Sequence, residues 1–232
     1  MPGTPVTSAA RYVPPTRDLA RLRAAATRCR GCELWRRATQ TVFGEGPRHA
    51  DLLLVGEQPG DVEDRAGHPF VGPAGRLLDE SLVAAGIDRR RVWLTNAVKH
   101  FKWEPRGKRR IHAKPTSREV AACRPWLEAE IAAVRPRLVV TLGATAAQAL
   151  LGPKFRLTRH RGERLAWEPA QQPQPGTSAP SVMATVHPAA ILRAPDGESR
   201  RRETARFVRD LRAAARDVAR ASPPTGRRSR SA

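Results

Sequence analysis

The sequence predicts an α/β protein of three layers, in which helices cover both faces of a central, mostly parallel four-stranded sheet. Three observations predict this class. Short apolar stretches, such as residues 52–55 and 138–142, have the length and composition of buried strands. Segments with helical periodicity lie between such stretches, so strands and helices alternate along the chain. No internal repeat is visible, and the length favours one domain.

The first half of the chain contains two of the expected strands. Residues 1–15 hold four prolines and little apolar periodicity, which predicts a flexible arm. A helix is expected from Thr16, its candidate N-cap, to the CRGC motif. Strands are expected at residues 50–56 and 91–98, and the amphipathic helix between them is stopped by Gly86.

The second half begins with a basic, proline-punctuated segment, residues 101–117, whose length predicts a functional or disordered loop. Ser117 is the candidate cap of the next helix. The later elements are a strand at 137–143, a helix ended by Gly152, a proline-rich loop at 165–181, a strand at 181–188 and a helix at 198–221. These elements define one domain, residues 16–221, and a basic disordered tail, residues 222–232.

The chain carries 42 lysine and arginine residues against 22 acidic ones, a net charge of +20. Such an excess favours a polyanionic partner, nucleic acid before an anionic membrane. A membrane partner is not expected, because no amphipathic anchor is present and no apolar run could cross a bilayer. The alternative is that the excess, mostly arginine, reflects biased composition and keeps the surface soluble. The N-terminus lacks the apolar run of a secretory signal, so a cytoplasmic protein is expected.

Cys29, Cys32 and Cys123 are an odd number of cysteines, which argues against a disulfide scaffold and for a metal site, a cluster or buried thiols. A redox role of the CRGC pair is disfavoured because a helix, not a strand, precedes it. Zinc or an iron–sulfur cluster needs a fourth ligand, and His100 is the obvious candidate. The alternative is that Cys123 is a small buried core residue.

The loops after three predicted strands carry polar and aromatic side chains, and these loops meet at the carboxyl edge of a parallel sheet. GEQPG precedes a helix start that could receive an anion, but it lacks the lysine of a P-loop. Phe70 is either a plug of the core, which is favoured, or a platform on which a base stacks. His187 is either a buried structural residue or an electrophile directed at developing negative charge.

The KRRIH motif places four basic side chains in the long loop: Lys108, Arg109, Arg110 and His112. One interpretation is a solvated loop that touches phosphates and contributes only salt-dependent affinity. In the other, His112 is a general base or a nucleophile, since neutral imidazole is competent near pH 7.

Taken together, the CRGC pair, GEQPG with HPFVGPAG, TNAVKH and VHPAAIL resemble the uracil-DNA glycosylase superfamily, within it the iron–sulfur family 4 type. The resemblance covers roughly residues 16–215. Two features are similar to the UdgX subgroup: Gln58, where family 4 usually has alanine, and the inserted KRRIH motif. One departure is Ala189, where many relatives carry serine, so one hydrogen bond to phosphate or sugar would be missing.

The resemblance implies a structural [4Fe-4S] cluster held by Cys29, Cys32, His100 and Cys123. His100 occupies the position of a cysteine in ordinary family 4 members, as it does in the UdgX type. The cluster would tie the N-terminal helix to the loop that carries the DNA contacts.

The resemblance also implies a site for uracil in DNA. Phe70 would stack on the extruded base, Asn96 would bind its amide edge through a donor and an acceptor, and His187 would hydrogen-bond its O2 atom. Glu57 and Gln58 would line the pocket beside the deoxyribose. The further substrate-binding residues expected are Gly56, Lys108, Arg109, Arg110 and Arg193.

The implied activity is that of a uracil-DNA glycosylase, an N-glycosyl hydrolase of base excision. Single-stranded DNA is the preferred partner, because extruding a base from it costs least. His112 would attack C1′ in place of water, while Glu57 orients the imidazole and accepts its proton. His187 would stabilise the leaving uracil, and Gln58 completes the expected catalytic set. We expect a monomer of the bacterial cytosol or nucleoid that acts once and stays attached to its product.

Three alternatives stay open. The first is an ordinary multiple-turnover family 4 glycosylase, and the second is a non-catalytic DNA-binding protein of the same fold with a zinc ion or cluster as a staple. The third, least favoured, is a redox protein that uses the CxxC pair.

Overall fold

The computed structural model of the protein describes residues 8–169 and 179–220. In this part of the chain the sheet has five strands rather than the expected four, in the order β2-β1-β5-β7-β6. The strands are β1 (Leu52–Gly56), β2 (Val92–Asn96), β5 (Leu138–Leu142), β6 (Arg164–Leu165) and β7 (Ser181–Thr185). The first three and β7 run parallel, and the short β6 adds an antiparallel edge in a segment expected to be a loop.

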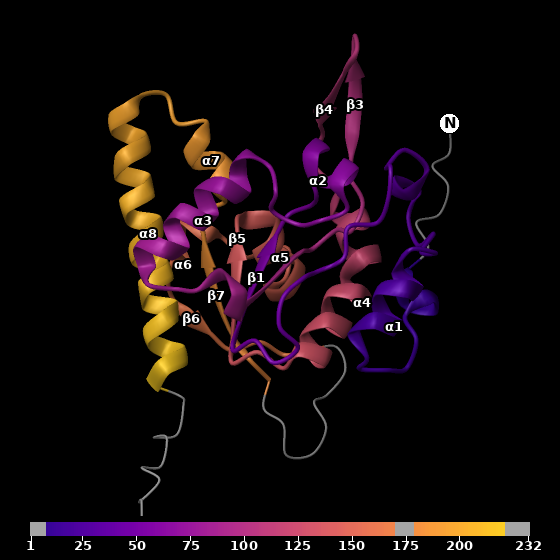
Figure 1. Ribbon diagram of the computed structural model, residues 1–232, viewed down its shortest axis with the longest axis horizontal. Helices are drawn as coiled ribbons and strands as arrows, with labels where there is room; N and C mark the ends of the chain where they lie inside the picture. Colours follow the sequence, from indigo (N-terminus) through magenta and orange to yellow (C-terminus); the bar gives the residue numbers. More distant parts are fainter. Residues whose placement is uncertain (1–7, 170–178, 221–232) are drawn as a thin grey trace, which may run out of the picture.

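Helices cover both faces of the sheet, which confirms the three-layer α/β/α class (Figure 1). They are α1 (Leu19–Ala26), α2 (Asp61–Ala66), α3 (Pro73–Ala85), α4 (Ser117–Val134), α5 (Ala144–Leu151), α6 (Leu157–His160), α7 (Pro188–Leu192) and α8 (Gly197–Arg220), with the 3-10 helices η1 (Ala9–Tyr12), η2 (Glu33–Arg36) and η3 (Arg89–Arg91). As predicted, Gly86 and Gly152 are the residues that end α3 and α5. Within the described residues, no helix is both long enough and apolar enough to cross a membrane.

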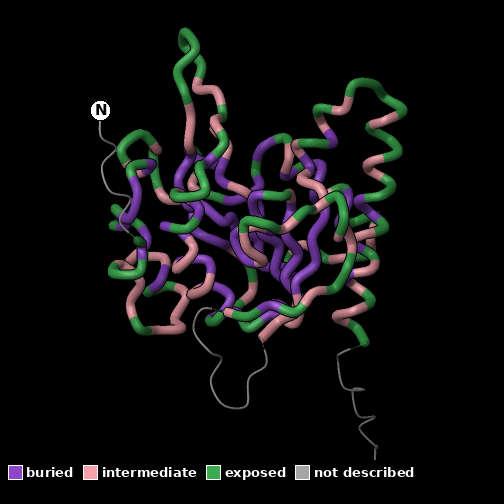
Figure 2. The backbone as a smooth tube through the Cα atoms, turned by 180° about the vertical axis from the view of Figure 1, so that it is seen from behind, coloured by how far each residue is buried: buried purple, intermediate pink, exposed green. Residues whose placement is uncertain are grey.

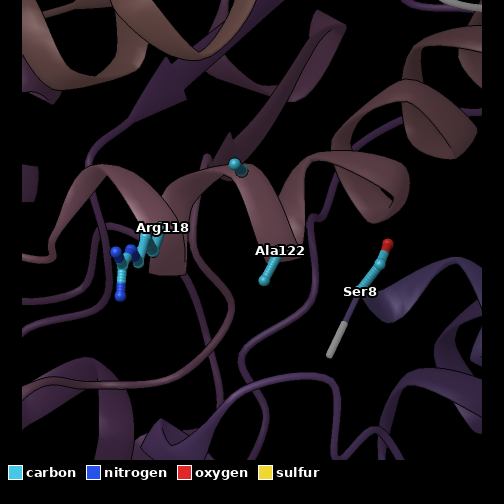
Figure 3. Close-up of a pocket in the computed structure, with 4 residues that line it drawn as sticks. Ser8, Arg118 and Ala122 are labelled. Atoms are coloured by element: carbon cyan, nitrogen blue, oxygen red, sulfur yellow. The ribbon is translucent and has the colours of Figure 1, made fainter. Parts of the chain in front are cut away.

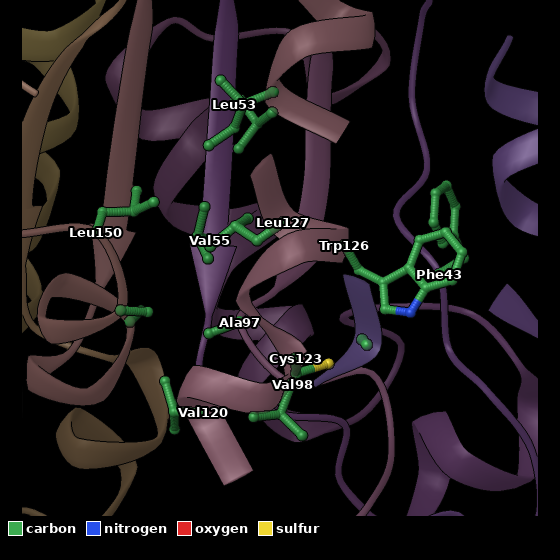
Figure 4. Close-up of a cluster of buried hydrophobic side chains, with 14 of the residues drawn as sticks. Phe43, Leu53, Val55, Ala97, Val98, Val120, Cys123, Trp126, Leu127 and Leu150 are labelled. Atoms are coloured by element: carbon green, nitrogen blue, oxygen red, sulfur yellow. The ribbon is translucent and has the colours of Figure 1, made fainter. Parts of the chain in front are cut away.

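Alternate residues of β1 contribute to two hydrophobic clusters, one on each face of the sheet. Leu53 and Val55 pack with side chains of α1, α4 and α5 (Figure 4). Leu52 and Leu54 pack with side chains of α3, α7 and α8. Every residue of β1 is buried, and the buried backbone lies at the centre of the molecule (Figure 2). This is the pattern of a parallel strand that is covered on both faces.

Two helix caps differ from the predicted ones. The N-cap of α1 is Asp18, whose carboxylate accepts hydrogen bonds from two backbone N–H groups, while Thr16 accepts one from the N–H of Asp18. The N-cap of α4 is Thr116 rather than Ser117, because Thr116 and Glu119 form a reciprocal capping box. In both helices a neighbouring polar residue makes the better cap.

The N-terminal segment is not a flexible arm over the whole of residues 1–15. Within it η1 packs against α4, and Ala9 is only 1% exposed. A Cβ on Gly31 would lie 2.7 Å from the Cα of Ala9, so the glycine of the CRGC motif allows this close approach. The expectation of an arm is therefore wrong for η1. Residues 1–7, part of the proline-rich loop (170–178) and the expected tail (222–232) lie outside the described residues.

The expected loop at residues 101–117 contains an antiparallel hairpin of β3 (Trp103–Arg106) and β4 (Arg109–His112). The hairpin extends away from the body of the molecule (Figures 1 and 2). Gly107 in its turn has a φ of 59°, a conformation that favours glycine. The two strands carry charged side chains and a proline with little apolar alternation, so the sequence pattern did not predict them.

Candidate functional site

The carboxyl ends of β1 and β2 bring three expected site residues together. Gly56 and Asn96 are paired at the ends of these parallel strands. A Cβ on Gly56 would collide with the Asn96 side-chain oxygen and would lie 2.7 Å from the tip of the Phe70 ring. Glycine at position 56 therefore lets the amide and the aromatic ring approach the strand end, and the three residues form one candidate binding wall.

Phe70 is held in an uncommon backbone conformation, with a φ of 58°. The carboxylate of Glu63 accepts hydrogen bonds from the N–H groups of Gly60 and Gly72, at 3.1 and 2.7 Å, and so ties together the loops on either side. A Cβ on Gly75 would collide with the carbonyl of Phe70. The ring belongs to the buried cluster under α3, yet its tip reaches Gly56, so both expected roles of Phe70 are compatible with its position.

Asn96 is a buried amide that is available to a ligand. Its residue is 3% exposed, and its side chain makes no hydrogen bond to any other residue in the described part of the chain. The Asn96 amide is not one of the fully enclosed polar groups that lack a partner, so a ligand can reach it. This arrangement suits a partner that offers both a donor and an acceptor.

His187 is the N-cap of α7, and its Nδ1 accepts a hydrogen bond of 3.1 Å from the N–H of Ala189. The neutral ring must therefore carry its proton on Nε2, which leaves that N–H as a donor. Burial, together with the electrostatic influence of Arg193 and His112, lowers the pKa of His187 to about 4. The ring lies 6.3 Å from that of Phe70, with an angle of 25° between the planes. His187 is thus a neutral donor beside the aromatic wall.

His112 and Glu57 approach each other from opposite sides of the same space. His112, the last residue of β4, has its Nε2 at 3.5 Å from Oε1 of Glu57, which directly follows β1. The His112 side chain is 50% exposed, and its ring centroid lies 6.1 Å from that of Phe101. An exposed imidazole next to a carboxylate can act as a nucleophile or exchange a proton with that carboxylate.

Gln58 does not face the pocket as expected. Its Nε2 donates to the carbonyls of Lys102 and Ala113, both at 3.1 Å, and its Oε1 accepts from the N–H of Lys102 at 3.1 Å. Lys102 and Ala113 flank the hairpin, so the Gln58 amide joins the two ends of the segment that carries His112. The structure therefore makes Gln58 a positioning residue, because its amide is already occupied by the backbone.

Arg110, expected to contact DNA, is engaged by two carboxylates of the protein itself. Its guanidinium pairs with Asp61 at 2.5 Å and Asp64 at 2.7 Å, and its side chain is only 14% exposed. Lys108 and Arg109, by contrast, are exposed and form no ion pair with described residues. The KRRIH motif thus splits into an anchor, Arg110, and two side chains available to phosphates.

Sequence reasoning did not find the acidic partners of this anchor. Asp61 and Asp64 are three residues apart on α2, and the Asp64 carboxylate also accepts from the N–H of Thr39 at 3.0 and 3.1 Å. Two carboxylates on one face of a helix, close in sequence to GEQPG, could have been recognised as ion-pair partners for a residue of the KRRIH motif. Lys99 and Glu130, considered below, were also missed.

The three cysteines are buried free thiols. Burial raises the pKa of Cys32 to about 11 and that of Cys123 to about 12, and interactions among the three sulfurs add to the rise in both. Cys29 and His100 line a common cavity of about 590 Å³ that has no acidic residue in its wall. His100 is 5% exposed, and its Nε2 lies 2.9 Å from the hydroxyl of Thr41.

Three thiols and an imidazole are donors of the kind that iron–sulfur clusters take, although Cys32 and Cys123 do not line the cavity that Cys29 and His100 share. No group of three or more histidine, cysteine or acidic side chains is close enough to bind one metal ion within the described ranges. A cluster of several irons spaces its ligands further apart than one ion does, and it prefers thiolates to carboxylates. The backbone N–H of Lys99 donates to the sulfur of Cys123 at 3.4 Å, as is common around cluster sulfurs.

A second hollow, of about 420 Å³, lies between η1 and α4 (Figure 3). It is lined by Ser8, Arg118, Ala121 and Ala122. Ser8 is engaged as the cap of η1, so the hollow offers only one charged group, Arg118, to a ligand. It carries none of the chemistry described above.

The chain is similar to known proteins over most of its length. Residues 43–212 match the family described as the Uracil DNA glycosylase superfamily. The chain is 34% identical over 188 residues to the type-4 uracil-DNA glycosylase of Sulfurisphaera tokodaii, which covers 79% of this chain and 80% of the relative. It is 38% identical over 175 residues to the type-4 uracil-DNA glycosylase of Thermotoga maritima, covering 75% and 83%. The type-5 uracil-DNA glycosylase of Thermus thermophilus is 33% identical over 166 residues, covering 63% and 68%.

Proposed function

This chain belongs to the uracil-DNA glycosylase superfamily, and we propose that it excises uracil from DNA and then stays covalently attached to the emptied sugar through His112. Uracil-DNA glycosylase activity of the type-4 kind follows from the family and its relatives. The attachment, which would make the enzyme UdgX-like and single-turnover, goes further. The observation that carries it is the approach of His112 to Glu57 at 3.5 Å on an anchored hairpin.

Uracil binding is proposed at the wall formed by Gly56, Phe70 and Asn96. The unpaired amide of Asn96 can donate to O4 and accept from N3–H of uracil, a pairing that cytosine cannot offer with the same polarity. Phe70 would stack on the extruded base, as aromatic side chains do in nucleotide sites. The exposed Arg193 lies near enough to influence His187, and it would contact phosphate or sugar.

Cleavage of the glycosidic bond leaves negative charge on uracil and positive charge on the sugar. His187, neutral and protonated on Nε2, would donate to O2 of the departing uracil. One preorganised donor of this kind is worth about 3 kcal/mol in the transition state. A neutral donor suits this step because no proton transfer is needed for uracil to leave as an anion.

The covalent step conserves atoms and charge. The bond between C1′ and uracil N1 breaks with its electron pair leaving on uracil, and one nitrogen of the His112 ring then attacks the cationic C1′. The proton on the other ring nitrogen then passes to Glu57, which leaves a neutral imidazole bonded to the sugar. Gln58 and Arg110 support the step by fixing the hairpin that carries His112. The adduct would be a stable product, so each molecule acts once.

Cys29, Cys32, His100 and Cys123 would hold a [4Fe-4S] cluster, whose contribution when bound is structural cross-linking rather than redox chemistry. These residues link the segment after α1 to the segment after β2 and to α4. Ligation by His100 would use Nδ1 or replace the contact of Nε2 with Thr41. The chain's own side chains carry out every step of the excision.

The substrate is proposed to be uracil in single-stranded DNA, bound by one protein molecule. An unpaired base is extruded at the lowest cost, a few kcal/mol less than in a duplex. Lys108 and Arg109 at the turn of the hairpin, and Arg193 after α7, are exposed and would neutralise backbone phosphates.

A denaturing gel with labelled, uracil-containing single-stranded DNA tests the proposal. We expect one equivalent of released uracil per protein and a DNA–protein band that survives SDS and heat. Release of many equivalents without such a band would identify an ordinary multiple-turnover type-4 glycosylase. Binding without any release would identify a DNA-binding protein that lacks activity. Each result contradicts the covalent proposal in a different way.

A further inference from the structure

A buried ion pair lies behind the candidate pocket and takes no part in the chemistry proposed above. Lys99 and Glu130 have side chains that are 1% and 0% exposed, with Nζ at 2.5 Å from Oε2. The Glu130 carboxylate also accepts from the N–H of Gly44 at 2.8 Å and the hydroxyl of Thr95 at 2.7 Å. The Lys99 ammonium lies 5.9 Å from the centre of the Phe43 ring. Phe43 itself belongs to the hydrophobic cluster of Figure 4.

Burying such an ion pair is not an efficient way to stabilise a core, because its desolvation costs free energy. Two charges lose their hydration on burial, and apolar residues of the same volume are often at least as stable. The nearby Arg124–Glu128 pair on α4 shows the ordinary case, a partly exposed contact between successive turns. A role other than stability is therefore worth seeking for Lys99.

The ammonium of Lys99 also holds the backbone of Asn96. Its Nζ donates to the Asn96 carbonyl at 2.7 Å and to the Thr95 hydroxyl at 2.7 Å. The other side of the same peptide unit is fixed by β1, because the N–H of Ala97 donates to the carbonyl of Gly56 at 2.9 Å. Both polar groups of the peptide unit after Asn96 are thus engaged.

The position of β2 in the sheet explains why a side chain is needed here. β2 is an edge strand with β1 as its only neighbour in the five-stranded sheet of the described residues. The carbonyl of Asn96 points away from β1. On that side of β2 the backbone of Glu45 pairs with Leu94, and the Asn96 carbonyl accepts from a side chain instead. Lys99, three residues later, bends back and supplies that donor, and Glu130 on α4 keeps its ammonium in place.

We propose that Lys99 is a positioning residue for recognition of the base, which fixes the direction of the Asn96 amide through the Asn96 carbonyl. The inference rests on the proposed function, in which Asn96 binds uracil. Without the ammonium, the peptide unit is free to tilt and the amide loses its alignment with the base. Contacts to DNA phosphates lie on other elements and are unaffected. Lys99 thus serves binding of uracil itself rather than binding of DNA.

The test compares the double variant Lys99→Met/Glu130→Gln with Arg124→Met/Glu128→Gln. The first pair of changes removes both buried charges together, and the amide introduced by Glu130→Gln keeps an oxygen for the Gly44 N–H. The second removes an ion pair from the same helix that does not touch Asn96. Three quantities are measured for each protein: inhibition by free uracil, the saturating single-turnover rate of uracil release, and affinity for uracil-free single-stranded DNA.

We expect the Lys99/Glu130 variant to bind free uracil at least tenfold more weakly and to release uracil roughly tenfold to a hundredfold more slowly, the scale of a small misplacement. Its affinity for uracil-free DNA should stay within twofold, and the control variant should match the wild type throughout.

Wild-type uracil affinity and rate in the Lys99/Glu130 variant would overturn the inference. If that variant does not fold, Lys99→Leu/Glu130→Gln decides, because it likewise removes the donor to the Asn96 carbonyl. An unchanged uracil affinity in Lys99→Leu/Glu130→Gln would then overturn the inference. Failure of the wild type to release uracil would instead overturn the proposed function.

Discussion

His112 Nε2 lies 3.5 Å from Glu57 Oε1, although the two residues come from a projecting hairpin and from the end of a buried strand. This separation is longer than an ordinary hydrogen bond. The ring is therefore near the carboxylate without being held in one orientation. An imidazole in this state can turn toward a sugar in the pocket and still transfer its proton to Glu57.

Glu57→Gln should separate excision from attachment. Glutamine retains the shape of the side chain and can still orient the imidazole, but it cannot accept a proton at neutral pH. Attachment should slow by about a hundredfold or more, the usual contribution of a general base. Uracil release should continue, because His187 supplies the leaving-group donor. Both rates can be followed in one reaction with excess enzyme, and an adduct that forms at the wild-type rate would exclude a role for the carboxylate.

Gln58→Ala should loosen the hairpin at its base. The change removes three hydrogen bonds at 3.1 Å and leaves backbone groups of Lys102 and Ala113 without this partner. We expect a loss of about 1–3 kcal/mol in stability and a lower yield of adduct per uracil released. Gln148→Ala, which removes a bond to the carbonyl of Phe155, is the matched control. Equal adduct yield in the two variants would argue against the positioning role.

Arg110→Ala should behave as the loss of an anchor rather than of a DNA contact. It leaves the buried carboxylate of Asp64 without its guanidinium, which should cost about 3 kcal/mol and lower the melting temperature. Arg109→Ala and Lys108→Ala should instead preserve stability and each reduce the salt dependence of DNA binding by about one charge. Salt titrations and thermal melts of all three variants check this. A reduced salt dependence with unchanged stability in Arg110→Ala would contradict its role as an anchor.

The low pKa of His187 makes a prediction about pH. Because that pKa is about 4 rather than 6.5, the ring stays neutral in the folded protein at pH 5, where an ordinary histidine is mostly protonated. Uracil release by His112→Ala, measured from pH 8 to 5, should show no loss with a midpoint near 6.5 caused by His187. A midpoint there that disappears in His187→Gln would contradict the assignment of a neutral donor.

The same shift affects stability in a defined direction. The unfolded chain binds a proton at this histidine near pH 6.5, and the folded protein does so only near pH 4. The contribution of His187 to stability is therefore present above about pH 6.5 and is lost as the pH falls from there to about 4. Urea denaturation of His187→Gln should show a weaker dependence on pH in this window than the wild type does.

Cys123→Ser should remove the proposed cluster and the order that it provides. Anaerobically purified wild-type protein should be brown and contain iron and sulfide, whereas the variant should be colourless and melt at a lower temperature. Zinc in place of iron in the wild type, with no visible absorption, would contradict the iron–sulfur assignment.

The sequence predicted the parallel core of the fold because periodicity and glycine stops are local properties. Residues 52–55 are apolar without interruption, as in strands buried on both faces, and Gly86 and Gly152 end their helices as expected. It did not predict the hairpin, whose strands carry mainly charged side chains. It also predicted four strands rather than five. The missed strand, β6, has only two residues, which form a strand through their pairing with β7 and show no strand pattern in the sequence.

The candidate site was predicted in part for a similar reason. Gly56, Asn96 and His187 follow predicted strands, and the geometry of a parallel sheet brings such positions to one edge. Gln58, Arg110 and Lys99 are each held by a partner 31 to 55 residues away in the chain, which no local pattern specifies. Each of the three was either assigned to the substrate or overlooked, because a polar side chain near a pocket looks the same in sequence whether it binds a ligand or a backbone.

Peptide mapping of the protein after reaction with a short uracil-containing oligonucleotide tests the central claim most directly. Mass spectrometry should find the added deoxyribose on the peptide that contains His112 and on no other peptide, and His112→Ala should yield released uracil without an added mass. An attachment at any other residue, or uracil release by the wild type with no attached peptide, would contradict the mechanism proposed for this site.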